Sequence, residues 1–276
     1  FFASYLVANR DNLALAGRRV LGLNLPRARH LGPLFIVWGV SICVLVLQKD
    51  LGSSVLLFGL FVVVLYVATD RPSWLLIGAA LFLPAAWFAA THLNHVQQRI
   101  NGWLHATDNA VYNAAGGSWQ LLTGMFGMST GGLMGAGWGK GSPTLVTFAN
   151  SDFIFASLGE ELGLTGTLAI LMLYLVLIQR GLRTAVLLRD GFGKLLATGL
   201  AFSVCLQCFV VLGGITRVIP LTGLTTPFLS AGGSSLLANW AIIALLLRIS
   251  DQARRPAVTE AKPTLGSDDT QVVKIR

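Results

Sequence analysis

The chain has 276 residues, of which 54% are hydrophobic and only 12% are charged. A soluble domain carries roughly 25% charged residues, so this composition excludes an ordinary soluble fold. The formal net charge is +8, but the basic residues form no run with interleaved aromatic residues, which argues against a nucleic-acid partner.

The sequence opens with an apolar stretch, Phe1–Val7, that has the composition of the end of a hydrophobic helix. This stretch has neither the basic start nor the small-residue cleavage site of a signal peptide. We therefore expect the sequence to begin inside a larger protein, late in a membrane helix.

Further apolar runs of nearly membrane-spanning length follow along the chain. Several are short or interrupted by glycine and proline, which is tolerated where neighbouring helices bury the backbone. They predict an all-α polytopic integral membrane protein with about six complete transmembrane helices after the end of a preceding one. The predicted spans are Pro33–Leu47, Ser54–Thr69, Trp74–Leu93, Phe153–Ile178, Leu195–Ile215 and Gly232–Leu247.

Basic residues are distributed unevenly between the polar connections. One alternate set of connections, together with the C-terminal tail, holds most of the 20 basic residues, whereas the other set holds only Lys49, Arg99, Lys140 and Arg217. Positively charged loops stay in the cytoplasm. The second set, residues 48–53, 94–152 and 216–231, is therefore predicted to face outward, and the C-terminus to face the cytoplasm.

The middle outward connection, residues 94–152, is far longer than the usual helix connection of about 2–8 residues. Its aromatic residues include Trp103, Trp119 and Trp138 among many glycines, which favours an ordered, functional extracellular loop over a disordered one. Residues 256–276 are polar and aperiodic, which is typical of a flexible cytoplasmic tail. We therefore divide the chain into a transmembrane domain, residues 1–255, and this tail.

Few acidic residues lie on the outward side, and a charge near the membrane interior is costly enough to mark function. Asp152 precedes an apolar run, and its carboxylate either takes part in the chemistry or caps a helix. Asp50, beside Lys49, is either a cap or part of a corner that binds an anion. Glu160 and Glu161 lie about two turns deeper. Adjacent helical residues cannot share one face, so at least one of them should point into the protein and need a donor.

Two glycine-rich stretches lie on the same side. Gly131–Gly141 resembles a phosphate-binding loop, but Lys140 is followed by glycine and the spacing of a P-loop is not met. The stretch therefore predicts close approach or bending of the backbone. The second stretch, Pro220–Ser235, predicts a broken start to the last helix, whose irregular backbone must be buried in protein or line a cavity.

Taken in order, these motifs resemble those of the SEDS family, the shape, elongation, division and sporulation proteins that include RodA and FtsW. The resemblance extends from about Phe1 to Arg255, and the ending around Asn239 and Trp240 is more similar to RodA. The matching segments are Gln48–Gly52, Arg99–Ile100, Gln120, Gly131–Leu133, Ser151–Ala156, Gly159–Gly163 and Pro220–Ser235.

Departures from the family pattern are modest, and none of them removes an acidic residue. They are Lys49 and His105 in place of a frequent proline, Ser151 in place of threonine, and Ala231 in place of tyrosine.

The resemblance implies the later part of a ten-helix fold, with the large extracellular loop between the third and fourth complete helices of this chain. It also implies a peptidoglycan glycosyltransferase that polymerises lipid II on the outer face of the bacterial cytoplasmic membrane, with a class B penicillin-binding protein as partner. Whether elongation, division or sporulation is served stays open.

Asp152 matches the family's catalytic aspartate, and Asp50 matches the aspartate of its Gln-Pro-Asp-Leu-Gly motif. We expect Asp152 to act as general base on the acceptor sugar hydroxyl. The diphosphate of the donor would meet a cation, either a basic side chain or a divalent metal, Mg²⁺ or Mn²⁺, near Asp50; no organic cofactor is expected. The residues expected to bind substrate or support the site are Lys49, Asp50, Arg99, Gln120, Lys140, Glu160, Glu161, Arg217, Pro227, Ser230, Gly232, Gly233 and Ser234.

Two other functions remain open from the residues alone. Broken helices and buried acids also suit a flippase that transports the lipid-linked precursor. A structural scaffold for the penicillin-binding partner would need neither Asp50 nor Asp152.

Overall fold

The computed structural model describes residues 1–9, 17–20, 23–26 and 50–254, together with residues 32, 36, 39, 40 and 43. The predicted tail 256–276, Lys49 and most of the predicted span Pro33–Leu47 lie outside the described residues.

Five helices of the described part are long and apolar enough to cross a membrane. Each of these helices coincides with a predicted span to within a few residues, except that two of them extend further than predicted at their C-terminal ends. Large apolar side chains on their outer faces, such as Leu76, Leu83 and Trp87, stay exposed, as expected of surfaces in contact with lipid. The predicted helical membrane bundle is confirmed. The five helices are α4 (Leu51–Thr69), α5 (Ser73–His92), α9 (Ile154–Leu187), α10 (Gly191–Ile215) and α11 (Gly233–Arg254).

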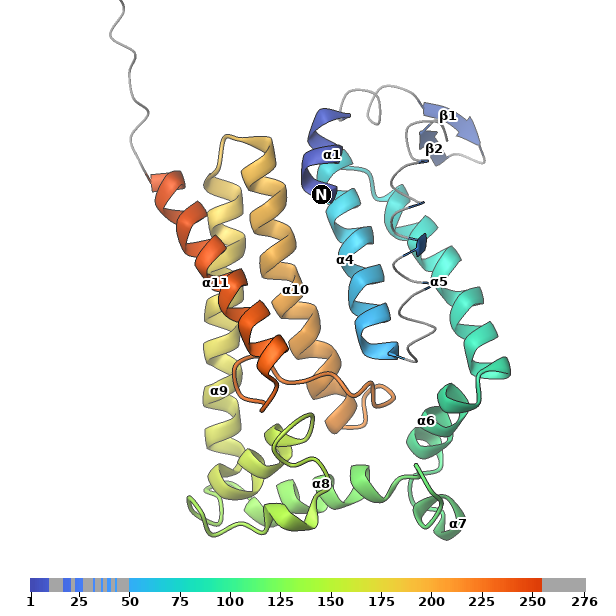
Figure 1. Ribbon diagram of the computed structural model, residues 1–276, viewed down its shortest axis with the longest axis vertical. Helices are drawn as coiled ribbons and strands as arrows, with labels where there is room; N and C mark the ends of the chain where they lie inside the picture. The colour runs from blue at the N-terminus through green and yellow to red at the C-terminus, as the bar shows by residue number, and fades with distance from the viewer. Residues whose placement is uncertain are drawn as a thin grey trace, which may run out of the picture.

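Helix α10 lies at the centre of the bundle, in contact with α4, α9 and α11 and with the short α1 (Phe2–Ala8) (Figure 1). Its residues Ala197, Ala201 and Val204 are almost completely buried. A Cβ atom added at Gly181 of α9 would lie 2.8 Å from the Cβ of Ala201. Small residues thus let the two helices pack closely, as is usual for helix pairs in membranes.

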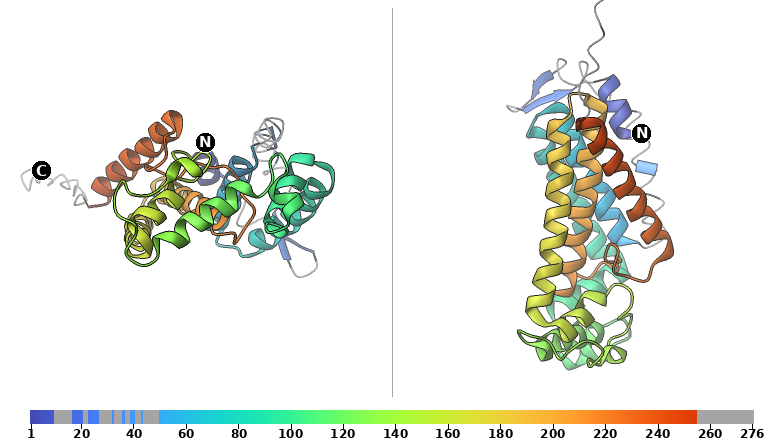
Figure 2. Two further views of the ribbon diagram at one scale, coloured as in Figure 1. Left: turned by 90° about the horizontal axis from the view of Figure 1, so that it is seen from below. Right: turned by 90° about the vertical axis from the view of Figure 1, so that its left-hand side faces the viewer.

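The two sets of connections lie at opposite ends of the bundle (Figure 1). At the lower end are α6 (Asn94–Leu104), α7 (Asn109–Tyr112), α8 (Trp119–Gly131) and the 3₁₀ turn η1 (Pro143–Leu145). Viewed from below, α8 runs across the end of the bundle (Figure 2). The long predicted loop, residues 94–152, is therefore ordered, as its aromatic content predicts.

The opposite end holds the α4–α5 and α9–α10 turns and a short antiparallel hairpin of β1 (Gly17–Val20) and β2 (Leu23–Pro26). This hairpin was not predicted. Its strands have four residues each, too few for a period-two pattern to stand out in a sequence.

Helix α9 is 34 residues long and is interrupted at Gly163, where φ is 68° and ψ is −171°. The interruption frees backbone groups on both sides, and the glycine-rich stretch pairs with them. The N–H groups of Ala136 and Gly137 donate to the carbonyls of Glu160 and Glu161, at 2.9 and 3.0 Å. In the opposite direction, the N–H groups of Leu164 and Thr165 donate to the carbonyls of Gly132 and Leu133, at 2.9 and 3.1 Å.

This pairing explains why the stretch is rich in glycine. A Cβ atom at Gly135 would lie 2.1 Å from the carbonyl oxygen of Glu161, and one at Gly131 would lie 2.2 Å from that of Gly159. Gly135 also has a φ of +81°, which favours glycine. The prediction of close backbone approach is confirmed.

Candidate active site

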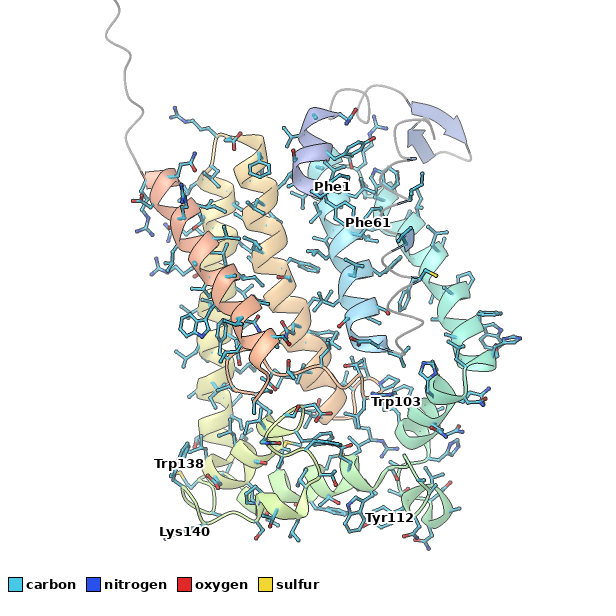
Figure 3. All side chains as sticks on the ribbon, viewed as in Figure 1. Phe1, Phe61, Trp103, Tyr112, Trp138 and Lys140 are labelled. Carbon is cyan, nitrogen blue, oxygen red and sulfur yellow. The ribbon has the colours of Figure 1, made fainter. Side chains whose placement is uncertain are left out.

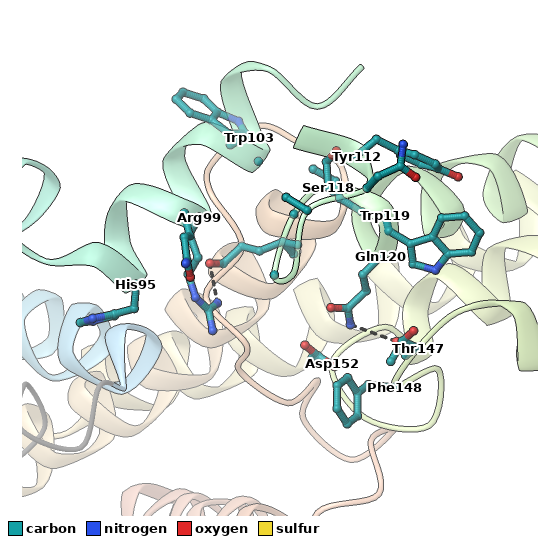
Figure 4. Close-up of a pocket in the computed structure, with 18 residues that line it drawn as sticks. His95, Arg99, Trp103, Tyr112, Ser118, Trp119, Gln120, Thr147, Phe148 and Asp152 are labelled. Atoms are coloured by element: carbon teal, nitrogen blue, oxygen red, sulfur yellow. Dashed lines mark hydrogen bonds between the residues drawn. The ribbon is translucent and has the colours of Figure 1, made fainter. Parts of the chain in front are cut away.

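A cavity of about 700 Å³ opens at the lower end of the bundle, between α6, the segment leading into α8, and the residues before α9 (Figure 4). Polar side chains supply much of its wall. Those of particular interest are His95, Gln98, Arg99, Tyr112, Asn113, Trp119, Gln120 and Asp152.

Asp152 lies two residues before the start of α9 and borders this cavity. The next residue, Phe153, is completely buried, and a Cβ atom added at Gly124 of α8 would lie 2.7 Å from its ring. Phe153 is also the N-cap residue of α9, and no side chain caps that helix. Capping therefore does not account for Asp152.

Two opposing influences act on the carboxyl group of Asp152. Burial raises its pKa above the usual value, while a hydrogen bond from its own backbone and the positive charge of Arg99 lower it. The burial effect is the largest, so the net shift is upward. A carboxylate with a raised pKa in a cleft is typical of a group that exchanges protons during catalysis.

Arg99 is held in place by the segment that precedes α11. Its Nη1 donates to the carbonyl oxygen of Leu221 at 2.7 Å. Gly223, with a φ of +78°, turns the chain so closely that an added Cβ would lie 3.5 Å from Nη2 of Arg99. Arg99 thus combines a structural contact with a charge that acts on Asp152.

The same segment also fixes the backbone beside Asp152. The hydroxyl of Ser230 donates to the carbonyl of Ser151 at 2.5 Å and accepts the backbone N–H of Thr226 at 2.7 Å. The N–H of Ala231 donates to the carbonyl of Asn150 at 2.8 Å. Ser230 therefore positions the residues that carry Asp152.

Side chains of the membrane helices anchor this segment in turn. The hydroxyl of Tyr174 in α9 donates to the carbonyl of Pro227, and Nε2 of Gln207 in α10 donates to the carbonyl of Thr225 at 2.9 Å. The hydroxyl of Thr225 donates to that of Ser235 in α11 at 2.8 Å. The prediction that this irregular backbone is buried in protein or lines a cavity is confirmed.

Two of the predicted cations lie outside the cavity wall. Arg217 donates from Nε to the carbonyl of Trp103 at 2.8 Å and from Nη2 to that of Leu104 at 3.0 Å. The indole of Trp103 donates back to the carbonyl of Arg217 at 3.0 Å. Lys140 is exposed and lies beside Trp138, on the side of the molecule away from Trp103 and Tyr112 (Figure 3).

The other predicted acids also lie apart from the cavity wall. The carboxylate of Asp50 caps α4 by accepting the N–H of Ser53 at 3.0 Å. Glu160 accepts the N–H of Ser142 at 2.9 Å, which supplies the expected donor for one of the two glutamates. Glu161 packs against Gly141.

Among the remaining predicted residues, Gln120 lines the cavity and donates to the carbonyl of Thr147 at 2.9 Å. Gly232 packs on Thr225, and Gly233 begins α11. Ser234 is exposed. The structure thus brings together Arg99, Gln120 and Asp152, while the other predicted residues support them or lie elsewhere.

Several cavity residues were not singled out from the sequence. His95 lies one turn before Arg99 on α6, so helical periodicity around Arg99 would have identified it. Gln98 is the residue immediately before Arg99. The rings of Tyr112 and Trp119 lie 5.1 Å apart between centroids, with 55° between their planes. Trp119 is 48% exposed and Tyr112 is half-buried, and a partly exposed aromatic pair of this kind offers an apolar surface to a ligand.

The described residues contain no group of three or more histidine, cysteine, aspartate or glutamate side chains placed to hold a metal. A divalent cation at this cavity would therefore depend on Asp152, water and ligand oxygens. Mg²⁺ is commonly held in this way, by one or two carboxylates together with substrate phosphates.

The profile of the family described as a cell cycle protein (FtsW, RodA and SpoVE) matches residues 1–255. The chain is 48% identical over 276 residues to the peptidoglycan glycosyltransferase RodA of Mycobacterium tuberculosis, a match that covers 99% of this chain and 58% of that protein. It is 31% identical over 224 residues to a probable peptidoglycan glycosyltransferase FtsW of Geobacter metallireducens, covering 80% of this chain and 59% of that protein. The chain thus spans a little over half the length of these relatives.

Two solved structures share the fold. One belongs to a study of how a peptidoglycan synthase complex coordinates polymerization and crosslinking; its TM-score is 0.65 at 23% identity, covering 92% of this chain and 81% of that chain. The other is a point variant of the rod shape determining protein RodA of Thermus thermophilus, with a TM-score of 0.51 at 20% identity, covering 92% of this chain and 78% of that chain.

Proposed function

The chain belongs to the FtsW, RodA and SpoVE family of cell cycle proteins, and from this premise we propose that it carries the catalytic cavity of a peptidoglycan glycosyltransferase. The substrate is lipid II, which is polymerised into glycan strands. The observation that carries the proposal is the partly buried carboxyl group of Asp152, which faces a cavity of about 700 Å³ near the charge of Arg99. The similarity to RodA proteins favours a role in elongation and cell shape.

In this reaction the acceptor sugar hydroxyl attacks the anomeric carbon of the donor sugar, and undecaprenyl diphosphate leaves. Asp152 removes the hydroxyl proton as the new bond forms, a contribution worth roughly 10²–10⁴-fold in rate. The diphosphate is already a stabilised anion, so it needs positive charge more than a proton. Arg99 supplies that charge from the cavity wall, next to the carbonyl of Leu221.

The orientation follows from the placement of charge. The end that carries the cavity faces the outside of the bacterial cytoplasmic membrane, because the opposite end holds the arginine-rich connections. The C-terminus is then cytoplasmic. A class B penicillin-binding protein is the proposed partner, and a relative of the same fold belongs to a peptidoglycan synthase complex. A divalent cation, Mg²⁺ or Mn²⁺, would assist by neutralising the diphosphate.

The test is polymerisation of purified lipid II in detergent by the full-length protein with its partner. Asp152→Asn keeps the size of the side chain but removes the base, so the rate should fall at least about 100-fold. Asp108→Asn is the matched control, because Asp108 is an exposed acid at the same end of the bundle that does not line the cavity. Equal polymerisation rates for the parent and Asp152→Asn would show that Asp152 takes no part in the chemistry.

The same assay separates the alternatives. A flippase would give no polymer in detergent but would move labelled precursor across the membrane of sealed vesicles. A scaffold would tolerate replacement of both Asp50 and Asp152 without a phenotype.

A further inference from the structure

A second cavity lies at the opposite end of the bundle, between the ends of α9 and α11. Its volume is about 210 Å³, room for about seven water molecules at roughly 30 Å³ each. The residues that line it are Arg180, Arg183, Thr184, Leu187, Ser250, Ala253 and Arg254.

The spacing of these residues shows how two helices build one basic hollow. On α9 they fall at intervals of three and four residues, and on α11 they do the same, so each set occupies one helix face. Three guanidinium groups, those of Arg180, Arg183 and Arg254, therefore border a single space. In the described part of the chain no hydrogen bond or ion pair to these three groups is found, and no acid lines the cavity.

The acids at this end of the described chain lie outside the cavity lining. The carboxylate of Asp190 caps α10 by accepting the N–H groups of Phe192 and Gly193, at 3.4 and 2.8 Å. Asp251 lies on α11 but is not part of the cavity lining. The lining of the cavity thus carries a positive charge, which suits an anionic ligand.

The depth of the cavity matches the headgroup level of a bilayer. Arg180 and Arg183 follow the interruption at Gly163 by 17 and 20 residues, about 26 and 30 Å along the helix. Arg254 follows Gly233 by 21 residues, about 31 Å. The hydrocarbon core is about 30 Å thick, and no charged residue occurs between 164 and 179. The arginines therefore emerge where lipid phosphates lie.

We propose that this cavity binds the phosphate headgroup of an acidic phospholipid. Guanidinium groups pair with phosphate oxygens through two parallel hydrogen bonds, and basic pockets between membrane helices on the cytoplasmic side suit such headgroups. The inference is independent of the proposed glycosyltransferase activity.

The experiment uses the full-length protein in detergent, titrated with phosphatidylglycerol, cardiolipin or phosphatidylcholine and followed by native mass spectrometry. The test variant combines Arg180→Gln, Arg183→Gln and Arg254→Gln. The control combines Arg189→Gln, Lys194→Gln and Arg248→Gln, which removes the same charge from the same end of the bundle but outside the cavity. A parallel arm adds inorganic phosphate as competitor.

We expect the parent and the control to retain acidic lipid over phosphatidylcholine, and the test variant to bind it at least about tenfold more weakly. Equal loss in both variants would mean that the basic surface as a whole, and not this cavity, attracts lipid. Absence of any lipid preference in the parent would overturn the proposal, and so would displacement of the lipid by inorganic phosphate, which would indicate a site for a soluble anion.

Discussion

At the scale of single residues, Asp152 illustrates how its surroundings alter an ordinary carboxyl group. Burial raises its pKa, and Arg99 partly offsets that rise. Since a general base must be ionised to act, the acid side of the pH–rate profile should report this pKa.

Polymerisation should therefore decline on acidification at a pH above the usual aspartate pKa of about 3.9. Arg99→Gln removes a charge that lowers the pKa of Asp152, so it should move the acid side of the profile to still higher pH. Arg99→Lys keeps the charge and serves as control. The measurement is kcat/KM for lipid II across the acid range, and an unchanged profile in Arg99→Gln would contradict the assignment.

The raised pKa also predicts an effect on stability. The contribution of a group whose pKa is raised by folding is present below the unfolded pKa and is lost as pH rises through the folded pKa. At neutral pH the ionised Asp152 therefore opposes folding, and Asp152→Asn should have an equal or higher Tm than the parent. The difference should shrink toward pH 4, as followed by thermal unfolding in detergent. A lower Tm at neutral pH would show that the carboxylate stabilises the fold.

Sequence motifs of the family pattern singled out Arg99, Gln120 and Asp152, and the structure places all three in the wall of one cavity. Their roles stay predictions. The contact between the rings of Tyr112 and Trp119 depends on how α7 and the start of α8 lie relative to each other, which no local pattern in the sequence specifies.

At the scale of elements, the apolar runs predicted the membrane helices but not where they end. Helix α9 was predicted to stop at Ile178 and continues to Leu187, and α11 continues from Leu247 to Arg254. Hydropathy reports the part of a helix that lies in lipid, and arginines can extend a helix beyond it. The interruption of α9 at Gly163 was not predicted, since it depends on the paired stretch 131–137.

Gly135→Ala tests that pairing. The new Cβ would lie 2.1 Å from a backbone carbonyl, and the position has a φ of +81°. Gly139→Ala is the matched control, because Gly139 has a φ of +70° but nothing within 4 Å of an added Cβ. Both variants share the cost of the left-handed conformation, about 1–2 kcal/mol. Gly135→Ala should lose clearly more stability than Gly139→Ala, measured as a lower Tm. Equal losses of stability in the two variants would argue against close packing at Gly135.

At the scale of the whole molecule, charge placement separated the connections into two sets, and the structure places these sets at opposite ends. Sidedness itself can be measured by cysteine labelling in a background without Cys43, Cys205 and Cys208. Met134 lies at the end with the cavity and is 82% exposed. The thiol of Met134→Cys should therefore react with an impermeant maleimide in intact cells.

Gln252→Cys, exposed at the other end, should react only after the membrane is permeabilised. The reverse pattern would invert the orientation and place the cavity on the cytoplasmic side, which would contradict the proposed reaction on the outer face of the membrane.

The reciprocal bonds between Arg217 and Trp103 have a mechanical consequence. They join α6, which carries Arg99, to the segment whose Ser230 holds the backbone next to Asp152. The same segment also accepts the bond from Arg99 at Leu221. Displacement of α6 therefore strains two contacts with this segment at once, so the place of Arg99 in the cavity wall depends on both.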